Sequence, residues 1–208
     1  MLSRHIGKDW RLNELDKVYL EKGFYPAKPS DQPEWVKEVG FGRQSVALTL
    51  ENCYDDWCMS ILAKELGKED DYKYYLNRAY NYRNVFDTKS GFMRPKTADG
   101  KWIEPFDPIW SGGQGGRDFY TENNGWNYTW YVLHDPQGLI NLMGGQEPFV
   151  AKLQQMFETN VPLYKKYDFL KQYPDMTGWI GMYSHGNEIT WHLSLIHISE
   201  PTRRTPIS

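Results

Sequence analysis

The segment from Gly115 to Leu139 concentrates carboxyl, amide and aromatic side chains that could do chemistry together. Within it, the run TENNGWNY places Glu122 shortly before Asn124 and Trp126. A carboxylic acid held among aromatic rings loses water, so its pKa rises and it stays protonated near neutral pH, able to donate a proton to a leaving group. Glu122 is therefore the candidate general acid. The competing interpretation is that Glu122 and the neighbouring asparagines only cap and hydrogen-bond a loop.

A second polar cluster occupies the run GMYSHGNE, residues 181–188. Asn187 and Glu188 carry the hard oxygen ligands that Ca²⁺ prefers, and Gly186 lets the backbone turn tightly. His185 is part of the same run. The pattern is compatible with a calcium site, and it is also typical of a simple polar turn.

A third candidate, Asp56, lies in the run YDDWC. Asp55 and Asp56 are adjacent, so on a helix their side chains point about 100° apart and only one can face a given neighbour. A packing role and a functional role are both open for Asp56. The sequence has no glycine-rich phosphate loop, no zinc-binding Cys/His spacing and no Gly-x-Ser-x-Gly motif, so any chemistry falls to carboxylates.

Helical periodicity predicts the elements that position these residues. One-face apolar spacing predicts a helix from Gln44 to Leu66, closed by Gly67, and a second from about Asp70 to Phe86; the short connection makes them an antiparallel hairpin. Capping, proline and apolar signals predict further helices over about Leu12 to Lys22, from Asp135 to Gly144, from Pro148 onward, weakly over Val161 to Tyr173, and near Asn187.

The span from Asp87 to Tyr120 is rich in Gly and Pro and has no sustained period. Long irregular segments in compact domains are usually functional when they are ordered, and the aromatic residues here favour order. No alternating strand run is evident. The predicted fold class is mainly α, with helical hairpins whose long aromatic loops gather at one end of a toroid.

The composition is globular: 208 residues, 40% hydrophobic and 25% charged, with a formal net charge of −3. Acidic and basic residues are interspersed, so nothing indicates a nucleic-acid partner, and no apolar run is long enough to span a membrane. Aromatic residues make up 16%, which suits stacking on sugar rings as well as core packing. Cys53 and Cys58 are badly spaced for a local disulfide and are interpreted as packing residues.

Four stretches of the sequence are similar to glycoside hydrolase family 92, the calcium-dependent exo-acting α-mannosidases. They are GRQSVALTLENCYDDWC, SGFMRPKTADGKW, YTENNGWNYTWYVLHDPQGLINLMGG and GMYSHGNE, and they occur in the family's order between about Gly42 and His192. The resemblance implies a partial (α/α)6-barrel catalytic domain, preceded in the parent protein by a β-sandwich domain. It also implies hydrolysis of terminal α-mannosidic bonds in a mannose-containing oligosaccharide, of N-glycan or mannan type, with inversion.

The first site carried over by the resemblance is the acid. Glu122 matches the family's general acid in Glu-Gly-Asn-Ala-Trp-Gln-Tyr, which here reads Glu-Asn-Asn-Gly-Trp-Asn-Tyr. Asn124 and Trp126 are retained and, with His185 and Asp56, are assigned to substrate binding.

The second carried-over site is the metal. Asn187 and Glu188 match the family's His-Gly-Asn-Glu segment at the calcium and the −1 sugar, and they are assigned as metal or sugar ligands. Calcium there would hold the vicinal O2 and O3 hydroxyls and distort the ring toward an oxocarbenium-like transition state.

Inversion also needs a second carboxylate, roughly 6.5–9.5 Å from the acid, to deprotonate the attacking water. In the family this base lies in an aspartate-rich segment downstream of His-Gly-Asn-Glu, and no such segment follows Glu188 here. The sequence therefore predicts a fragment that is inactive alone. Two other functions remain compatible with the sequence: a non-catalytic carbohydrate-binding helical module, and another (α/α)6 glycoside hydrolase.

The run LSLIHISEPTR, Leu193 to Arg203, resembles the in-frame translation of a sequencing adapter. We therefore expect residues 193–208 to be a non-native tail and residues 1–192 to be a partial catalytic domain, truncated at both ends. No signal peptide is recognised at the start of the chain, and the resemblance predicts a periplasmic or extracellular parent.

Overall fold

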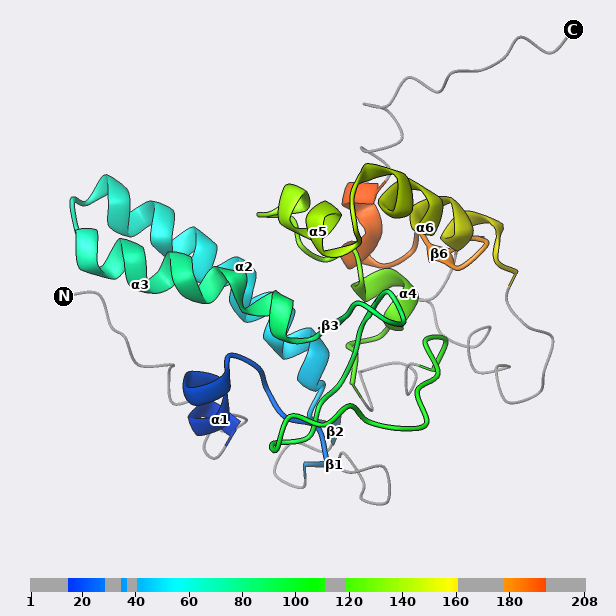
Figure 1. Ribbon diagram of the computed structural model, residues 1–208, viewed down its shortest axis with the longest axis horizontal. Coiled ribbons are helices and arrows are strands. Elements are labelled where there is room, and N and C mark those ends of the chain that lie inside the picture. The colour runs from blue at the N-terminus through cyan, green and yellow to red at the C-terminus, as the bar shows by residue number, and fades with distance from the viewer. Residues whose placement is uncertain (1–14, 29–34, 37–40, 111–118, 161–177, 194–208) are drawn as a thin grey trace, which may run out of the picture.

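The computed structural model of the chain describes residues 15–28, 35–36, 41–110, 119–160 and 178–193. Within these ranges helices predominate, and strands occur as three antiparallel pairs of two residues each (Figure 1). The predicted class, mainly α, is confirmed. The weak helix predicted over Val161 to Tyr173 lies outside the described residues, as do 12–14 of the first predicted helix and 194–208 of the predicted tail.

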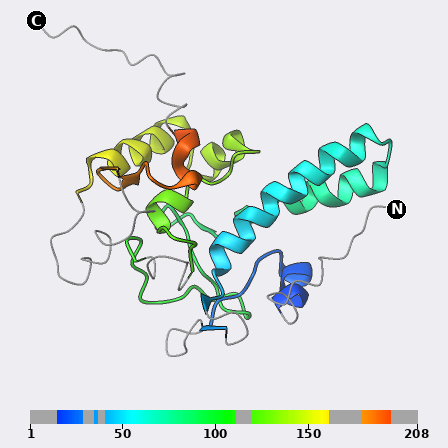
Figure 2. The same ribbon diagram turned by 180° about the vertical axis from the view of Figure 1, so that it is seen from behind.

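The longest element is helix α2, Ser45–Glu65, which packs along α3, Glu69–Ala79. The two form the predicted hairpin and project together from the rest of the molecule in both views (Figures 1 and 2). Helix α2 agrees with its prediction to one residue at each end. The prediction for the second helix was wrong beyond Ala79, because the chain tightens into the 3-10 turn η1, Tyr80–Asn84, and then enters a strand.

The three strand pairs were missed by the sequence analysis because a two-residue ladder is too short to show alternation. They are β1 (Trp35–Val36) with β2 (Phe41–Gly42), β3 (Phe86–Asp87) with β4 (Phe92–Met93), and β5 (Trp179–Ile180) with β6 (Tyr183–Ser184). Strand β4 and Asp87 of β3 lie in the span predicted to be irregular, whereas Phe86 of β3 was predicted to be the last helical residue and instead pairs with Met93.

The remaining helices are short and follow local signals. Asp135 caps α5, Pro136–Leu142, by accepting a hydrogen bond from the Gly138 N–H at 2.9 Å, as predicted. Helix α6, Gln146–Glu158, begins two residues before the predicted start. Helix α4, Gly125–Tyr128, and the 3-10 helix η4, Glu188–Thr190, are single turns.

A continuous cluster of buried apolar side chains joins the base of α2 to α4, α6 and the β5–β6 turn. Cys53 belongs to this core, as predicted, whereas Cys58 is exposed, so the prediction that both cysteines are packing residues was wrong for Cys58. Leu193, the first residue of the predicted tail, also packs in this core.

Helix α1, Leu15–Lys22, contacts the hairpin at a buried ion pair between α2 and α3. The Arg78 Nε atom of α3 donates to Asp56 Oδ2 of α2 at 2.9 Å, and the Tyr19 hydroxyl of α1 donates to the same oxygen at 3.2 Å. The side chains of Arg78 and Asp56 are only 12% and 6% exposed. Burial raises the pKa of Asp56 to about 6, although Arg78 opposes that shift.

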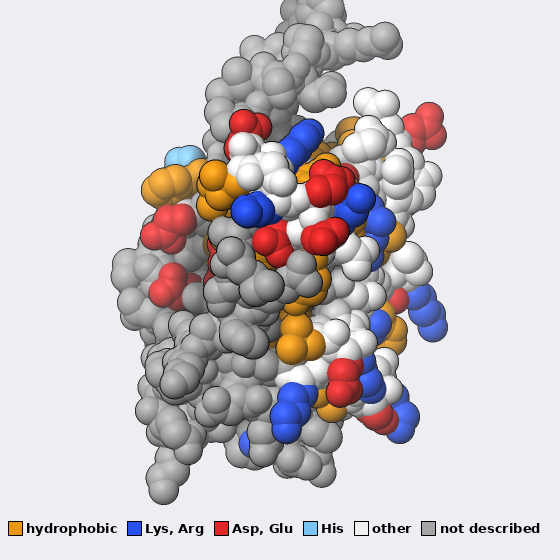
Figure 3. All heavy atoms as spheres, turned by 90° about the vertical axis from the view of Figure 1, so that its left-hand side faces the viewer, with side chains coloured by type: hydrophobic (Ala, Val, Ile, Leu, Met, Phe, Trp, Pro, Cys, Tyr) orange, Lys and Arg blue, Asp and Glu red, His pale blue; other side chains and the backbone are white. Residues whose placement is uncertain are grey.

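One face of the described residues shows no single dominant charge. Figure 3 shows acidic and basic side chains interspersed over the visible face. Apolar side chains are exposed near the end of the hairpin, including Ile61, Leu62 and Leu66. In the described part of the chain, no helix combines the length and the apolar character needed to cross a membrane.

The raised pKa of Asp56 predicts a pH-dependent stability. Because the folded state binds this proton more tightly than the unfolded state does, the free energy of unfolding falls as pH rises from about 4 through 6, by up to about 3 kcal/mol. Asp56→Asn removes this fall. Urea unfolding of the chain at pH 4.5 and pH 7 measures it, with Glu65→Gln, an exposed carboxylate on the same helix, as the control. Identical pH dependence in wild type and Asp56→Asn would contradict the prediction.

Candidate active site

Glu122 lies in a turn that is fixed to the start of α2. The Phe119 carbonyl accepts hydrogen bonds from the N–H groups of Val46 and Ala47, at 3.0 and 3.2 Å, and so satisfies two donors that a helix start leaves without partners. The Thr121 hydroxyl donates to Gln44 Oε1 at 2.7 Å. These hydrogen bonds anchor the turn to the start of the helical hairpin.

The backbone is left-handed on both sides of this contact. Gln44 has φ 56° and Glu122 has φ 59°, and they are the non-glycine residues with positive φ in the described part of the chain. Such conformations are uncommon for residues with a Cβ and persist where the surrounding contacts enforce them, often at functional sites. The strained backbone supports a functional interpretation of the Glu122 turn.

Helix α4 follows the turn, and all four of its residues are buried. Asn124 caps it by accepting from the Asn127 N–H at 3.3 Å, and the Tyr120 hydroxyl donates to the Met93 carbonyl at 2.7 Å. A Cβ on Gly125 would lie 3.0 Å from the Tyr120 hydroxyl oxygen and 3.3 Å from a backbone carbonyl. A side chain at this position would therefore fit only if these neighbours shifted by a few tenths of an ångström.

The side chain of Asn127 joins α4 to the β5–β6 turn. Its Nδ2 donates to the Met182 carbonyl at 3.0 Å, and its Oδ1 accepts from the Ser184 N–H at 3.2 Å. The same Nδ2 also lies 3.0 Å from Asn124 Oδ1. The sequence gives no signal for this bridge, because its partners are more than fifty residues away along the chain.

The bridge brings the two predicted polar clusters together. Asn187, which is 1% exposed, points its Nδ2 at Glu122 Oε2, 3.4 Å away. Its Oδ1 caps η4 by accepting from the Ile189 N–H at 3.4 Å. Thr190 ties this loop back to the Ser184 and Asn187 carbonyls, at 2.6 and 2.9 Å. The structure thus places an amide donor beside the candidate acid.

Two other predicted residues lie on the same loop and face outward. His185 and Glu188 are exposed. The Tyr183 hydroxyl and His185 Nδ1 lie 2.8 Å apart, and the Trp191 indole N–H donates to the His185 carbonyl at 3.1 Å. Of the predicted site residues, the structure therefore gathers Glu122, Asn124 and Asn187, with the side chain of His185 at the surface of the same loop.

Asp56 is not gathered with them. It lies three turns along α2 from the Glu122 turn and makes the ion pair with Arg78 described above. Among the described contacts its carboxylate joins three helices, and a role in substrate binding stays a prediction.

Trp126 is buried in the core instead of lining an open surface. It is 6% exposed, and its ring packs edge to face with Phe92, the centroids being 4.9 Å apart. The Lys152 Nζ atom lies 4.5 Å from its ring centroid. In the described structure the rings of Phe92 and Trp126 therefore pack around α4.

The predicted calcium ligands, Asn187 and Glu188, lie next to each other at the start of η4. No group of three His, Cys, Asp or Glu side chains among them could hold a metal ion. Asn187 uses its side-chain oxygen to cap η4 and turns its amide nitrogen toward Glu122, so it presents a donor where a cation would need an oxygen. Since Ca²⁺ takes about six to eight oxygen ligands, Glu188 would need further oxygens from other side chains, backbone carbonyls or water.

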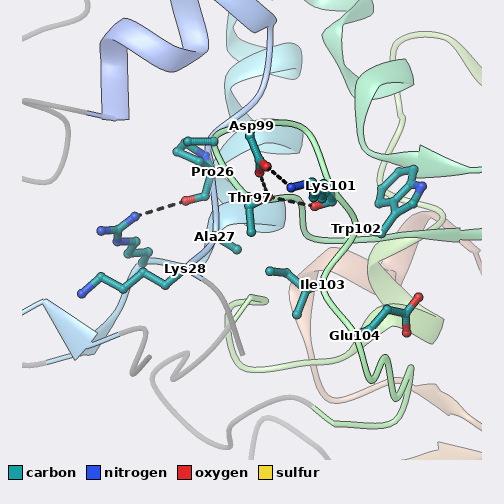
Figure 4. A pocket seen from close by; sticks show the side chains of 11 residues that line it. Pro26, Ala27, Lys28, Thr97, Asp99, Lys101, Trp102, Ile103 and Glu104 are labelled. Atoms are coloured by element: carbon teal, nitrogen blue, oxygen red, sulfur yellow. Dashed lines mark hydrogen bonds and ion pairs between the residues drawn. The ribbon is translucent and has the colours of Figure 1, made fainter. Parts of the chain in front are cut away.

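A separate hollow of about 750 Å³ lies where the loop after α1 meets the loop around Trp102 (Figure 4). Arg43 and Lys101 are among the cations that line it, and Lys101 pairs with Asp99 at 2.8 Å. None of the predicted site residues lines this hollow. It is therefore not the candidate site.

Comparison with known proteins gives consistent matches. Residues 4–197 match the family profile described as "Glycosyl hydrolase family 92 catalytic domain". A curated relative from Arthroderma benhamiae, named "Uncharacterized secreted glycosidase", is 31% identical, and the match covers 67% of this chain and 20% of the relative.

Two solved structures of family GH92 enzymes from Bacteroides thetaiotaomicron have similar folds. The α-mannosidase BT3965 is 37% identical with a TM-score of 0.67, covering 87% of this chain and 21% of its own. The inverting mannosidase BT2199 is 34% identical with a TM-score of 0.63, covering 86% and 22%. This chain therefore spans about a fifth of the length of the relatives it matches.

The Asn127 bridge predicts a large stability effect. Asn127→Ala removes three buried hydrogen bonds and lowers the free energy of unfolding by about 2–4 kcal/mol. Urea unfolding of the chain measures this loss. Asn141→Ala, which removes an exposed amide from α5, is the matched control, with an expected change within about 0.5 kcal/mol. Equal effects of the two substitutions would show that the bridge does not hold the loop.

Proposed function

This chain belongs to glycosyl hydrolase family 92, and on that premise we propose that it carries the acid-bearing part of the active site of an exo-acting α-mannosidase. The parent enzyme would hydrolyse terminal α-mannosidic bonds of a mannose-containing oligosaccharide with inversion. The family match favours this function over a non-catalytic carbohydrate-binding module. The α2–α3 hairpin supports the further proposal that residues 1–192 form part of an (α/α)6 barrel.

The observation that carries the proposal is the contact between Glu122 and Asn187. It joins two clusters that lie 65 residues apart in sequence, and the left-handed backbone at Glu122 supports a turn whose conformation is enforced by the surrounding contacts. A purely structural capping role for Glu122 would not need an amide donor supplied by a distant loop.

In this mechanism Glu122 protonates the leaving-group oxygen as the glycosidic bond breaks. The amide N–H of Asn187 can only donate a hydrogen bond, so Oε2 of Glu122 accepts it. This contact orients the carboxyl group. We therefore assign the transferred proton to Oε1. Asn124 contributes by capping α4, and the exposed His185 is assigned to contact with the sugar.

The calcium ion is a prediction that rests on the family resemblance alone. We assign Glu188, the exposed carboxylate on the loop beside Glu122, as one ligand of this ion. No step of the proton transfer described above requires the ion. A secreted relative supports a periplasmic or extracellular location for the parent.

Glu122→Gln in the full-length enzyme tests the acid. With an unactivated mannobiose, kcat should fall by about 10²–10⁴-fold because the leaving group needs a proton. With 2,4-dinitrophenyl α-mannoside, whose leaving group departs without one, most of kcat should survive. Glu158→Gln, an exposed carboxylate of α6, is the control. An equal fall with both substrates would refute the assignment of Glu122 as the acid.

The 208-residue chain is predicted to be inactive alone. Between Glu188 and Ser208 the only acidic residue is Glu200, so the sequence offers little to serve as the general base there. Incubating the chain with an aryl α-mannoside, with and without calcium, should release no measurable phenol above a buffer blank. Turnover that Glu122→Gln abolishes would show that the base lies within this chain.

A further inference from the structure

Lys152, in the middle of α6, places its ammonium group among aromatic rings beside α4. Its Nζ atom lies 3.5 Å from the ring centroid of Phe92 and 4.5 Å from that of Trp126. The two rings themselves meet edge to face, with an interplanar angle of 86°. One cation therefore contacts the aromatic pair that joins β4 to α4.

No polar contact in the described structure fixes the orientation of Trp126. Its indole Nε1 is buried and has no hydrogen-bond partner among the described residues. The position of the ring therefore depends on packing. A cation over an aromatic face is attracted by the ring quadrupole, most strongly where water is excluded, so Lys152 is the one charged group described as acting on this ring.

The position of Trp126 bears directly on the candidate site. It is the second residue of α4, a helix of only four residues. Asn124, which caps this helix, lies two residues after Glu122, and Asn127, which bridges to the Asn187 loop, is the next residue after Trp126. A shift of the indole ring would therefore move both the acid turn and the bridge that brings Asn187 to it.

We propose that Lys152 is a positioning residue for the hydrolytic reaction, holding Trp126 from α6 so that the Glu122 turn keeps its geometry. This inference rests on the proposed function, because it assigns Lys152 to the same site. Lys152 contacts neither the substrate nor the acid in this assignment; it acts through Trp126.

The charge of Lys152 is sensitive to mildly alkaline pH. Burial lowers the pKa of its ammonium to about 8, and no charged side chain of the described residues contributes to that shift. The groups it faces are the Phe92 ring of β4, the Trp126 ring of α4 and the Gly91 backbone of the β3–β4 turn. As pH rises through 8, Lys152 becomes neutral and the cation–π attraction is lost.

Three forms of the full-length enzyme test the proposal: wild type, Lys152→Arg and Lys152→Met. Arginine keeps the positive charge at every accessible pH, whereas methionine has an unbranched side chain of similar length and no charge. Lys64→Met is the matched control, because Lys64 also lies over an aromatic ring, 5.6 Å from the Tyr72 centroid, but on the distant hairpin. Thermal unfolding of each variant is recorded in parallel with kcat and KM for mannobiose.

At pH 6.5 we expect Lys152→Arg to match wild type, and Lys152→Met to lose about tenfold in kcat with KM changed less than twofold. At pH 9 the kcat of wild type should fall below that of Lys152→Arg and approach that of Lys152→Met. Lys64→Met should match wild type throughout. Unchanged kcat in Lys152→Met, or a wild-type pH profile identical to that of Lys152→Arg, overturns the proposal. An inactive wild-type enzyme instead overturns the proposed function.

A second measurement does not depend on activity. Reductive ¹³C-methylation of the lysines, followed by NMR, gives one signal that disappears in Lys152→Arg. The proposal expects that signal to be shifted upfield by the ring currents of Phe92 and Trp126, and to titrate well below the other lysines. A signal at the ordinary lysine position, with an ordinary lysine pKa, shows that the ammonium does not lie on these rings and overturns the assignment.

Discussion

Asn127 holds together two parts of the chain that are more than fifty residues apart, and the candidate site exists only where they meet. Its amide donates to the Met182 carbonyl and accepts from the Ser184 N–H. Because a buried polar group is costly without partners, a side chain that both donates and accepts defines one register of the β5–β6 turn against α4. That register is what allows Asn187 to reach Glu122.

A second constraint ties the same turn to the helical hairpin. The start of α2 has no side-chain cap, and the Phe119 carbonyl takes that place. The left-handed conformations of Gln44 and Glu122 are held on either side of this contact. Glu122 is thus fixed from the α2 side by backbone hydrogen bonds and from the opposite side by the Asn127 bridge and the packing of Trp126. Rigid support of this kind keeps a reacting group in a productive geometry.

The chain also shows how environment separates chemically identical groups. Asp56 and Glu122 are both carboxylates near aromatic residues, and from the sequence both are candidate functional residues. Asp56 is buried in an ion pair that joins three helices, whereas Glu122 is half-buried in a strained turn beside an amide from another loop. The same contrast applies to the aromatics, since Trp126 is enclosed by Phe92 and Lys152 and offers little free surface for a sugar.

The sequence by itself determined the features that depend on local or periodic signals. Apolar periodicity located α2 to within one residue, Asp135 and Pro136 located the start of α5, and the order of the motifs indicated the family. Tertiary structure alone decided where α3 ends, because Phe86 pairs with Met93 of β4, and which partner Asp56 takes. It also decided that Asn187 meets Glu122 and that Lys152 covers Trp126. Periodicity reports which face of an element is buried, but these contacts, between residues 7 to 65 positions apart, depend on how the elements pack.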